Sequence, residues 1–224
     1  MSFKHGVVIT GLIGSGKSTV CALLKERGYE IICADSIAHE ILELNASKVA
    51  ELFGAQLLSG GKVDRKALGA IVFANPSAKK SLEELLHPLI FDRICFLANE
   101  LEKSGKLYFV DIPLFFESGG RTKYDFATSL LVYAPKELCL KRILLRDKAD
   151  EINANARINS QMDIEKKRAL ADFVLKNTSD LASLEHDLRA IIEQIKTKMS
   201  LREASRDFRH CGNFVIASEA KQSK

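Results

Sequence analysis

The chain of 224 residues has no tryptophan, few cysteines and no long apolar run, and each shortage limits what the protein can be. Its five cysteines are odd in number, scattered and without a Cys-x-x-Cys pair. This argues against a disulfide framework and a zinc site, and we expect buried or incidental thiols. No apolar stretch approaches the length that crosses a bilayer, so we expect no membrane contact. The 12 Phe and 4 Tyr follow no regular spacing with basic residues, so most should lie in the core rather than stack on bases.

A strong charge of either sign is also missing. The formal net charge is +4, and residues 196–224, with seven basic and three acidic residues, account for all of it. A formally neutral body over 1–195 offers no basic footprint for a nucleic-acid backbone, so we expect no nucleic-acid partner. The first five residues run directly into an apolar strand, which leaves no room for a removable signal sequence and favours a cytoplasmic protein.

The chain does contain a phosphate-binding pattern. Residues Gly11 to Ser18 read Gly-Leu-Ile-Gly-Ser-Gly-Lys-Ser, which fits G-x-x-x-x-G-K-[ST]. An apolar run at 6–10 precedes the pattern and a helical stretch at 19–27 follows it, which is the order that a phosphate loop needs. In such a loop backbone N–H groups converge on phosphate oxygens, Lys17 reaches the β- and γ-phosphates, and Ser18 can ligate Mg²⁺. We therefore expect a nucleoside triphosphate as ligand, with a plain glycine-rich turn as the alternative.

Alternating strands and helices predict an α/β fold with three layers, in which a parallel β-sheet is flanked by helices on both faces. The stretch 36–106 shows helices without a convincing strand, and we expect a cap over the carboxyl edge of the sheet. Residues 196–224 break the pattern and are expected to be an extension outside the core, which leaves one domain over 1–195. Strands are predicted at 6–10, 29–33, 107–112, 129–134 and 173–176, and helices at 19–27, 65–73, 76–86, from Pro88 onward, at 136–146, 151–170 and 180 to about 199.

Asp35 follows the second predicted strand and so returns to the edge of the sheet where the phosphate loop lies. From there its carboxylate can face the γ-phosphate and act as the base for an acceptor hydroxyl. An N-cap for a helix over 36–44 is an equally good reading, because aspartate is common at helix starts. The spacing by itself leaves both roles open.

Further blocks along the chain add to the phosphate loop and Asp35. An Asp-x-Pro-Leu-x-x-Glu block lies at 111–117 and an Arg-x-x-x-Gln block at 157–161, and both are far more restrictive than the phosphate loop. The full set of blocks is 10–19, Ala34-Asp35, Val63-Asp64-Arg65 with Leu68, His87-Pro88, 111–117, Arg142, Arg146-Asp147, Arg157-Ile158 with Gln161, and Ala171-Asp172 followed by Asn177. With these blocks the chain resembles the dephospho-coenzyme A kinase family over about residues 6–195. It departs from the family's pattern at Leu12, where a glycine is usual, and at Thr178-Ser179, where a glycine usually follows the asparagine.

The resemblance implies a P-loop fold of the nucleoside-monophosphate-kinase type. It implies transfer of the γ-phosphoryl group of ATP, with Mg²⁺, to the ribose 3′-hydroxyl of dephospho-coenzyme A, the last step of coenzyme A synthesis. The cap at 36–106 would bind this acceptor, and a lid would span about 138–160. ATP would be bound by Gly14, Ser15, Gly16, Lys17, Ser18, Thr19 and Asn177.

Phosphoryl transfer depends on positioning and charge neutralisation more than on covalent help, and this suggests roles for the charged residues. Lys17 and Asp35 would be catalytic, with Asp35 contacting the acceptor and taking its hydroxyl proton. Asp111, at a strand end, would contact the substrate and hold Mg²⁺ together with Ser18. A plain turn aspartate is the alternative for Asp111.

The predicted lid carries three arginines. Arg142 and Arg146 lie four residues apart on one helix face, so both can point at the phosphates as catalytic residues when the lid closes. Surface arginines on a solvated helix are the alternative. For Arg157 the two readings stay equally open.

The remaining candidates have weaker support from the residues alone. By resemblance, Arg65 and His87 would help to seat the acceptor substrate, although the sequence alone reads them as a first-turn surface residue and a helix-boundary residue. Asn177 would contact the adenine end of ATP or merely end a strand in a turn.

Two other functions remain as alternatives. One is another small-molecule P-loop kinase, which the acceptor that drives ATP turnover would distinguish. The other is a nucleotide-dependent switch or ATPase with a macromolecular partner, which the neutral body and the missing Asp-x-x-Gly switch disfavour. We expect a monomer or a weak homo-oligomer.

Overall fold

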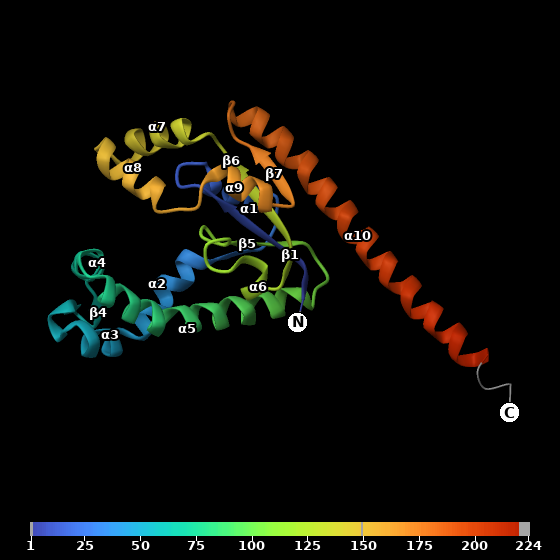
Figure 1. Ribbon diagram of the computed structural model, residues 1–224, viewed down its shortest axis with the longest axis horizontal. Helices are drawn as coiled ribbons and strands as arrows, with labels where there is room; N and C mark the ends of the chain where they lie inside the picture. The colour runs from blue at the N-terminus through green and yellow to red at the C-terminus, as the bar shows by residue number, and fades with distance from the viewer. Residues whose placement is uncertain (1, 149, 220–224) are drawn as a thin grey trace.

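The computed structural model of the protein describes residues 2–148 and 150–219, with only the backbone described at 203 and 205–219. Its centre is a parallel sheet of five strands in the order β2-β5-β1-β6-β7 (Figure 1). Val8 of β1 pairs with Val110 of β5 on one side and with Ser129 of β6 on the other, so β1 lies in the middle. The strands are β1 (Phe3–Gly11), β2 (Ile31–Cys33), β5 (Tyr108–Asp111), β6 (Phe126–Tyr133) and β7 (Phe173–Lys176).

Helices cover both faces of this sheet, which confirms the three layers. On one face Val7 and Ile9 pack against α1 (Lys17–Glu26) and against the first part of α10 (Leu181–Glu219). Successive strand side chains point to opposite faces, so Val8 between them joins a second cluster with α2 (Ala34–Leu44) and α5 (Pro76–Glu102). Burial of these apolar runs on both faces explains why they contain so few polar residues.

A third apolar cluster lies beside the phosphate loop. It joins Leu12 and Leu131 to α7 (Lys136–Asp147), α8 (Glu151–Asn159) and α9 (Ile164–Leu170). Leu12, where the resembled family has glycine, is buried in this cluster, so the larger side chain has a place to pack.

The stretch predicted as a cap contains α2, α3 (Ala46–Phe53), the 3₁₀ turn η1 (Ala55–Leu57), α4 (Arg65–Ala74) and α5. The expectation of helices without strands is corrected by a short hairpin, β3 (Leu58–Ser59) with β4 (Lys62–Val63). Gly60 and Gly61 at its tip both have positive φ, which glycine adopts without strain, and two-residue strands are too short to show a pattern in the sequence. The second half of α5 leaves the cap and packs along the sheet through Ile94 and Ala98.

Pro88 does not begin a helix, contrary to the prediction, but lies inside the continuous helix α5. A proline removes one backbone hydrogen bond, the one to residue 84. Pro88 and Glu84 are both exposed, so the carbonyl that loses its donor lies on the solvent side. Burial of Leu86 and Ile94 on the other side holds the helix together across the proline.

The single helix predicted over 151–170 is also wrong, because α8 ends at Asn159 and α9 begins at Ile164. Asp163 accepts hydrogen bonds from the backbone N–H groups of Glu165 and Lys166 and so caps a new helix. Of the helices described, none combines the length with the apolar composition that crossing a membrane requires.

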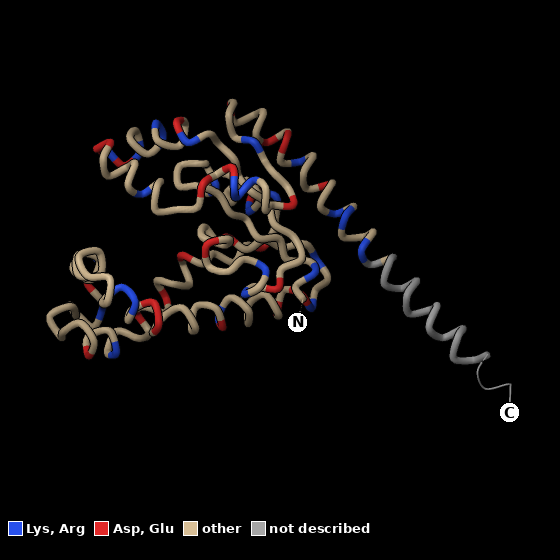
Figure 2. The backbone as a smooth tube through the Cα atoms, in the orientation of Figure 1, with Lys and Arg blue, Asp and Glu red and all other residues tan. Residues whose placement is uncertain are grey.

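The last helix, α10, continues to Glu219 rather than ending near Met199 as predicted. Along its described part the charges become basic toward the end (Figure 2), and Lys198 and Arg202 reach back to the body. The boundary expected at residue 196 therefore falls before residues that contact the sheet. Cys211 lies among the residues whose side chains are not described, whereas Cys21, Cys33, Cys95 and Cys139 are free thiols.

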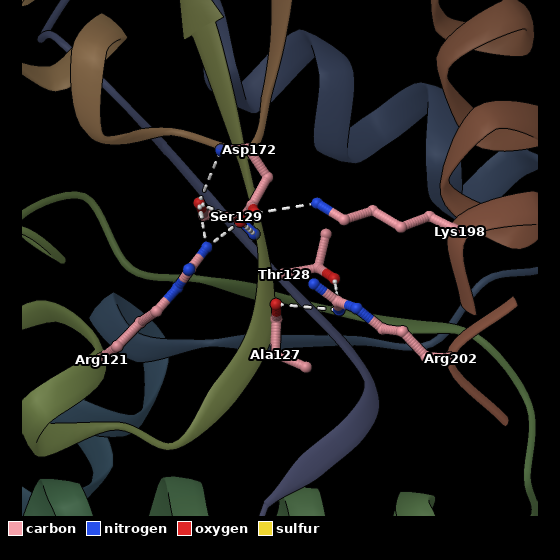
Figure 3. Close-up of polar contacts among 7 residues, drawn as sticks. All are labelled: Arg121, Ala127, Thr128, Ser129, Asp172, Lys198 and Arg202. Carbon is pink, nitrogen blue, oxygen red and sulfur yellow. Dashed lines mark hydrogen bonds and ion pairs between the residues drawn. The ribbon is translucent and has the colours of Figure 1, made fainter. Parts of the chain in front are cut away.

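Figure 3 shows the group of residues that anchors α10, which we call the Asp172 cluster. The Asp172 carboxylate accepts hydrogen bonds from the backbone N–H of Ser129 at 2.8 Å and from its hydroxyl at 2.9 Å, and it pairs with Arg121 and with Lys198. Arg202 donates to Ala127 O and Thr128 Oγ1, both at 3.0 Å.

Candidate active site

The loop between β1 and α1 has the geometry of a phosphate cradle. Gly14 and Gly16 have φ values of 81° and 91°, and a Cβ would come within 2.6 Å of Cys139 O at Gly14 and 2.1 Å of Asn177 Nδ2 at Gly16. Both positions therefore require glycine. The loop ends at the start of α1, where backbone N–H groups lack helical acceptors and the helix dipole is positive, so the arrangement suits an anion.

Lys17, the first residue of α1, lies over the end of β5. Its Nζ is 2.5 Å from Asp111 Oδ1, and both side chains are largely buried. Asp111 Oδ2 also lies 3.8 Å from the thiol of Cys21, and burial with this carboxylate raises the pKa of Cys21 to about 12. Since a lysine ammonium carries three donors, Lys17 can bind a phosphate oxygen while it keeps Asp111.

A cleft of about 1110 Å³ opens at the carboxyl ends of the strands. One wall is the phosphate loop with Lys17, and another is the start of α2 with Asp35. The cleft is also lined by His87 of α5, by residues between 112 and 118, and by Lys123 and Tyr124. Anions and a hydroxyl acceptor can thus share one space, as phosphoryl transfer requires.

Asp35 is the second residue of α2 and does not cap it. The N-cap position is Cys33, which makes no side-chain capping hydrogen bond. Of the two readings of Asp35, the N-cap is therefore contradicted, and its carboxylate lines the cleft.

Arg142 and Asn177 support the phosphate loop from behind. The amide of Asn177 donates to Ser15 O at 2.8 Å, and Arg142 donates to Ser15 O at 3.3 Å and to Asn177 O at 3.0 Å. Asn177 is buried beneath the loop, whereas Arg142 also lines the cleft. The observed contacts give Asn177 a positioning role for the loop, and a contact with adenine stays a prediction.

Arg146 lines the cleft one helical turn after Arg142, as their spacing predicts. Its guanidinium binds the neighbouring Asp147 through two hydrogen bonds of 2.6 and 3.0 Å, and Arg157 binds the same carboxylate at 2.6 Å. Hydrogen bonds from Arg146 and then Arg157 hold the pKa of Asp147 far below its usual range. Arg157 therefore joins α8 to α7, and it is not among the residues that line the cleft.

The structure brings together most, but not all, of the residues that the sequence singled out. Arg65 begins α4, where it is exposed and does not line the cleft. Ser15 and Asp111 are buried next to the cleft rather than along it. The predicted residues that do line it are Gly14, Gly16, Lys17, Ser18, Thr19, Asp35, His87, Arg142 and Arg146.

An ion pair beside the cleft, of which Glu117 is a lining residue, has no counterpart among the predicted site residues. Lys167 Nζ lies 2.7 Å from Glu117 Oε1 and also donates to Pro113 O, and its side chain is fully buried. Burial lowers the pKa of Lys167, and the hydrogen bond with Glu117 opposes this. Glu117 stands in the block that carries the resemblance, but Lys167 lies in a run of charged residues typical of a solvated helix, so no signal marked it.

The segment between α8 and α9 is tied to the site at two points. Gln161 Oε1 accepts from the backbone N–H of Ile13 in the phosphate loop at 3.0 Å, and Glu117 accepts from that of Met162 at 2.9 Å. The break that interrupts the predicted helix is therefore what brings α8 and α9 into contact with the loop.

The donor set fits a metal ion that arrives together with phosphate. Ser18 and Asp111 offer hydroxyl and carboxylate oxygens, which suit Mg²⁺. No group of three or more His, Cys, Asp or Glu among the described residues could hold a metal by itself. Mg²⁺ commonly takes only one or two protein ligands and completes its shell with phosphate oxygens and water.

Comparison with known proteins agrees with this geometry. The family model described as dephospho-CoA kinase matches residues 6–183. The dephospho-CoA kinase of Helicobacter pylori strain J99 is 43% identical over 195 residues, which cover 87% of this chain and 100% of the relative. That of Thermus thermophilus is 37% identical over 194 residues, covering 86% and 93%.

Solved structures show the same likeness in three dimensions. A dephospho-CoA kinase structure from Campylobacter jejuni superposes with a TM-score of 0.65 at 39% identity, covering 87% of this chain and 98% of that one. A Thermus thermophilus protein, TT1252, gives a TM-score of 0.72 at 37% identity, covering 84% and 96%. With a phosphate loop, an acidic residue across one shared cleft and relatives matched over nearly their whole length, the chain belongs to the dephospho-CoA kinase family.

Proposed function

We propose that the protein transfers the γ-phosphoryl group of ATP to the ribose 3′-hydroxyl of dephospho-coenzyme A, giving coenzyme A and ADP. The observation that carries the proposal is the single cleft lined by the phosphate loop on one side and by Asp35 on the other. Membership of the dephospho-CoA kinase family supports the choice of acceptor.

The cationic side chains around the phosphate loop neutralise the negative charge of the phosphates. Lys17 binds β- and γ-phosphate oxygens, with backbone N–H groups of the loop around them. Arg142 is held close to the loop by its hydrogen bond to Ser15 O, and Arg146 follows one turn later on the same face of α7. Both guanidinium groups stabilise the charge on the transferring group, more strongly in a site from which water is excluded.

Asp35 accepts the proton of the acceptor hydroxyl as the new phosphate ester bond forms. Its position in the first turn of α2 supports this role, because the side chain lines the cleft and caps no helix. Asp35 is oriented by a helix rather than by a loop, which favours a fixed geometry for proton transfer.

Ser18 and Asp111 would hold Mg²⁺, which supplies additional positive charge to the β- and γ-phosphates when it is bound. Arg65 and His87 remain proposed acceptor contacts, of which only His87 lines the cleft. That the protein is a monomer or a weak homo-oligomer also stays a proposal. A cytoplasmic location, where ATP is available, remains part of the proposal.

The test is ADP release from Mg·ATP with and without dephospho-coenzyme A, with adenosine, AMP and RNA as parallel acceptors. Mass spectrometry of the product should show the gain of one phosphoryl group on dephospho-coenzyme A. Turnover only with another small acceptor would assign the fold to a different kinase. Turnover driven by RNA or a protein would instead support a switch or ATPase.

A further inference from the structure

Lys123, the last residue of α6 (Gly120–Lys123), lines the cleft and has no role in the proposed reaction. It is half-buried, and its ammonium lies over two aromatic rings, 5.5 Å from the centre of Tyr124 and 5.8 Å from that of Phe91. The rings themselves pack 5.2 Å apart. A lysine ammonium is thus held at the wall of the cleft by attraction to aromatic faces.

The other basic side chains of the cleft already have polar partners. Lys17 pairs with Asp111, Arg142 donates to Asn177 O, and Arg146 binds Asp147. Within the described part of the chain, Lys123 makes no hydrogen bond or ion pair. The aromatic ring faces stabilise the charge of the Lys123 ammonium only in part, and its three N–H donors stay available.

Lys123 also lies next to α5, the helix that carries the proposed acceptor contact His87. Phe91, below its ammonium, stands four residues after His87, so the two occupy the same face of α5 one turn apart. The carboxylates of Asp35 and Glu83 line the same space, so an anionic acceptor needs a compensating cation there. Since the arginines of the cleft come from α7, Lys123 is placed to supply it.

We propose that Lys123 binds a phosphate of the diphosphate that joins the adenosine and pantetheine parts of the acceptor, and so favours acceptors with this group. The inference rests on the proposed function, because it names a contact for that substrate. The ammonium turns from the rings to the phosphate, which exchanges a cation–π contact for a charge-assisted hydrogen bond.

The experiment compares Lys123→Gln with Lys123→Arg, and uses Lys62→Gln, at an exposed position on the cap hairpin, as the matched loss of charge outside the cleft. Calorimetry measures the Kd for dephospho-coenzyme A at low and moderate salt, and steady-state assays give KM for ATP and kcat. Lys123→Gln should weaken dephospho-coenzyme A binding about tenfold at low salt, corresponding to about 1.4 kcal/mol. It should also reduce the salt dependence of binding, leave KM for ATP within about twofold and keep the melting temperature.

Lys123→Arg should retain most of the affinity, and Lys62→Gln should match the wild type. A Kd unchanged in Lys123→Gln would overturn the inference, as would an equal rise in KM for ATP. The two proposals can fail separately. Binding of dephospho-coenzyme A that depends on Lys123 but leads to no transfer would refute only the proposed reaction, and transfer that is indifferent to Lys123 would refute only this contact.

Discussion

Two carboxylates at different ends of the same sheet differ greatly in the number of hydrogen bonds and ion pairs that they make. At the amino end of β7, Asp172 is surrounded by Arg121, Lys198 and the N–H and hydroxyl of Ser129 (Figure 3). At the carboxyl end of β2, Asp35 faces an open cleft. The difference teaches how to separate structure from function: a carboxylate whose hydrogen bonds are all used stabilises the fold, and one with free capacity can serve a substrate.

The largest effect is expected for Asp35→Asn, which keeps the shape and removes the proposed base. We predict a loss in kcat of about 100- to 10,000-fold, with ATP binding and the melting temperature retained. Steady-state assays with ATP titration and thermal unfolding would measure this. Asp187→Asn, at an exposed position on α10, is the control. Undiminished turnover in Asp35→Asn would remove the proposed base from the mechanism.

The Lys167–Glu117 pair sharpens the comparison because it lies beside the cleft, whereas its charges are paired, as that of Asp172 is. Lys167→Met should lower the free energy of unfolding by about 3 kcal/mol, since it leaves the Glu117 carboxylate without its buried partner. Lys167→Arg should restore part of that loss. Denaturant titrations would measure both variants. If Lys167→Met kept full stability but lost kcat, the position of a residue beside the cleft would predict its role better than the number of hydrogen bonds it makes.

Asp172→Ala should reduce stability by about 2 to 3 kcal/mol, because Ser129 loses its acceptor and two cations lose their carboxylate. The guanidinium of Arg121 and the ammonium of Lys198 are partly exposed, so water offsets some of the cost. Activity per folded molecule should not change. A fall in the kcat of Asp172→Ala, measured well below its melting temperature, would contradict the assignment of Asp172 to stability alone.

The smallest effect concerns the end of the chain. A chain that ends at Met199 should stay folded and active and lose about 1 kcal/mol, because Arg202 and its bonds to Ala127 and Thr128 are removed. A chain that ends at Ile195 should lose more, since Lys198 goes as well. A chain that ends at Ala204 is the control and should match the full length. Thermal unfolding of the three would locate the boundary, and equal stability of all three would show that the Asp172 cluster needs no residue of α10 beyond 195.

The parts of the molecule that the sequence predicted are those whose signals are local. The phosphate loop is eight consecutive residues, and Asp35 follows its strand at a fixed distance along the chain. The strands were readable because burial on both faces leaves continuous apolar runs. Asp111 stands at the end of its strand, although its bond to Lys17 spans 94 positions.

The predictions failed where distant packing outweighs local preference. Pro88 favours a helix start, but Leu86 and Ile94 are buried along one continuous α5. Lys167 resembles a surface lysine in the sequence, but in the fold it is buried and pairs with Glu117, 50 positions earlier. Arg65 is a different case: it begins α4 and is not among the residues that line the cleft, so its contact with the acceptor stays a prediction that rests on its motif alone.

The thiol of Cys21 beneath Lys17 has a consequence for redox chemistry. Thiol–disulfide exchange and alkylation need the thiolate, and burial beside Asp111 raises the pKa of Cys21 to about 12. Burial likewise raises the pKa of Cys139, whose carbonyl approaches Gly14, to about 11. The proposed acceptor and product both end in a free thiol. Both cysteines are also buried, which limits the access of the thiol compounds that the cleft would have to admit.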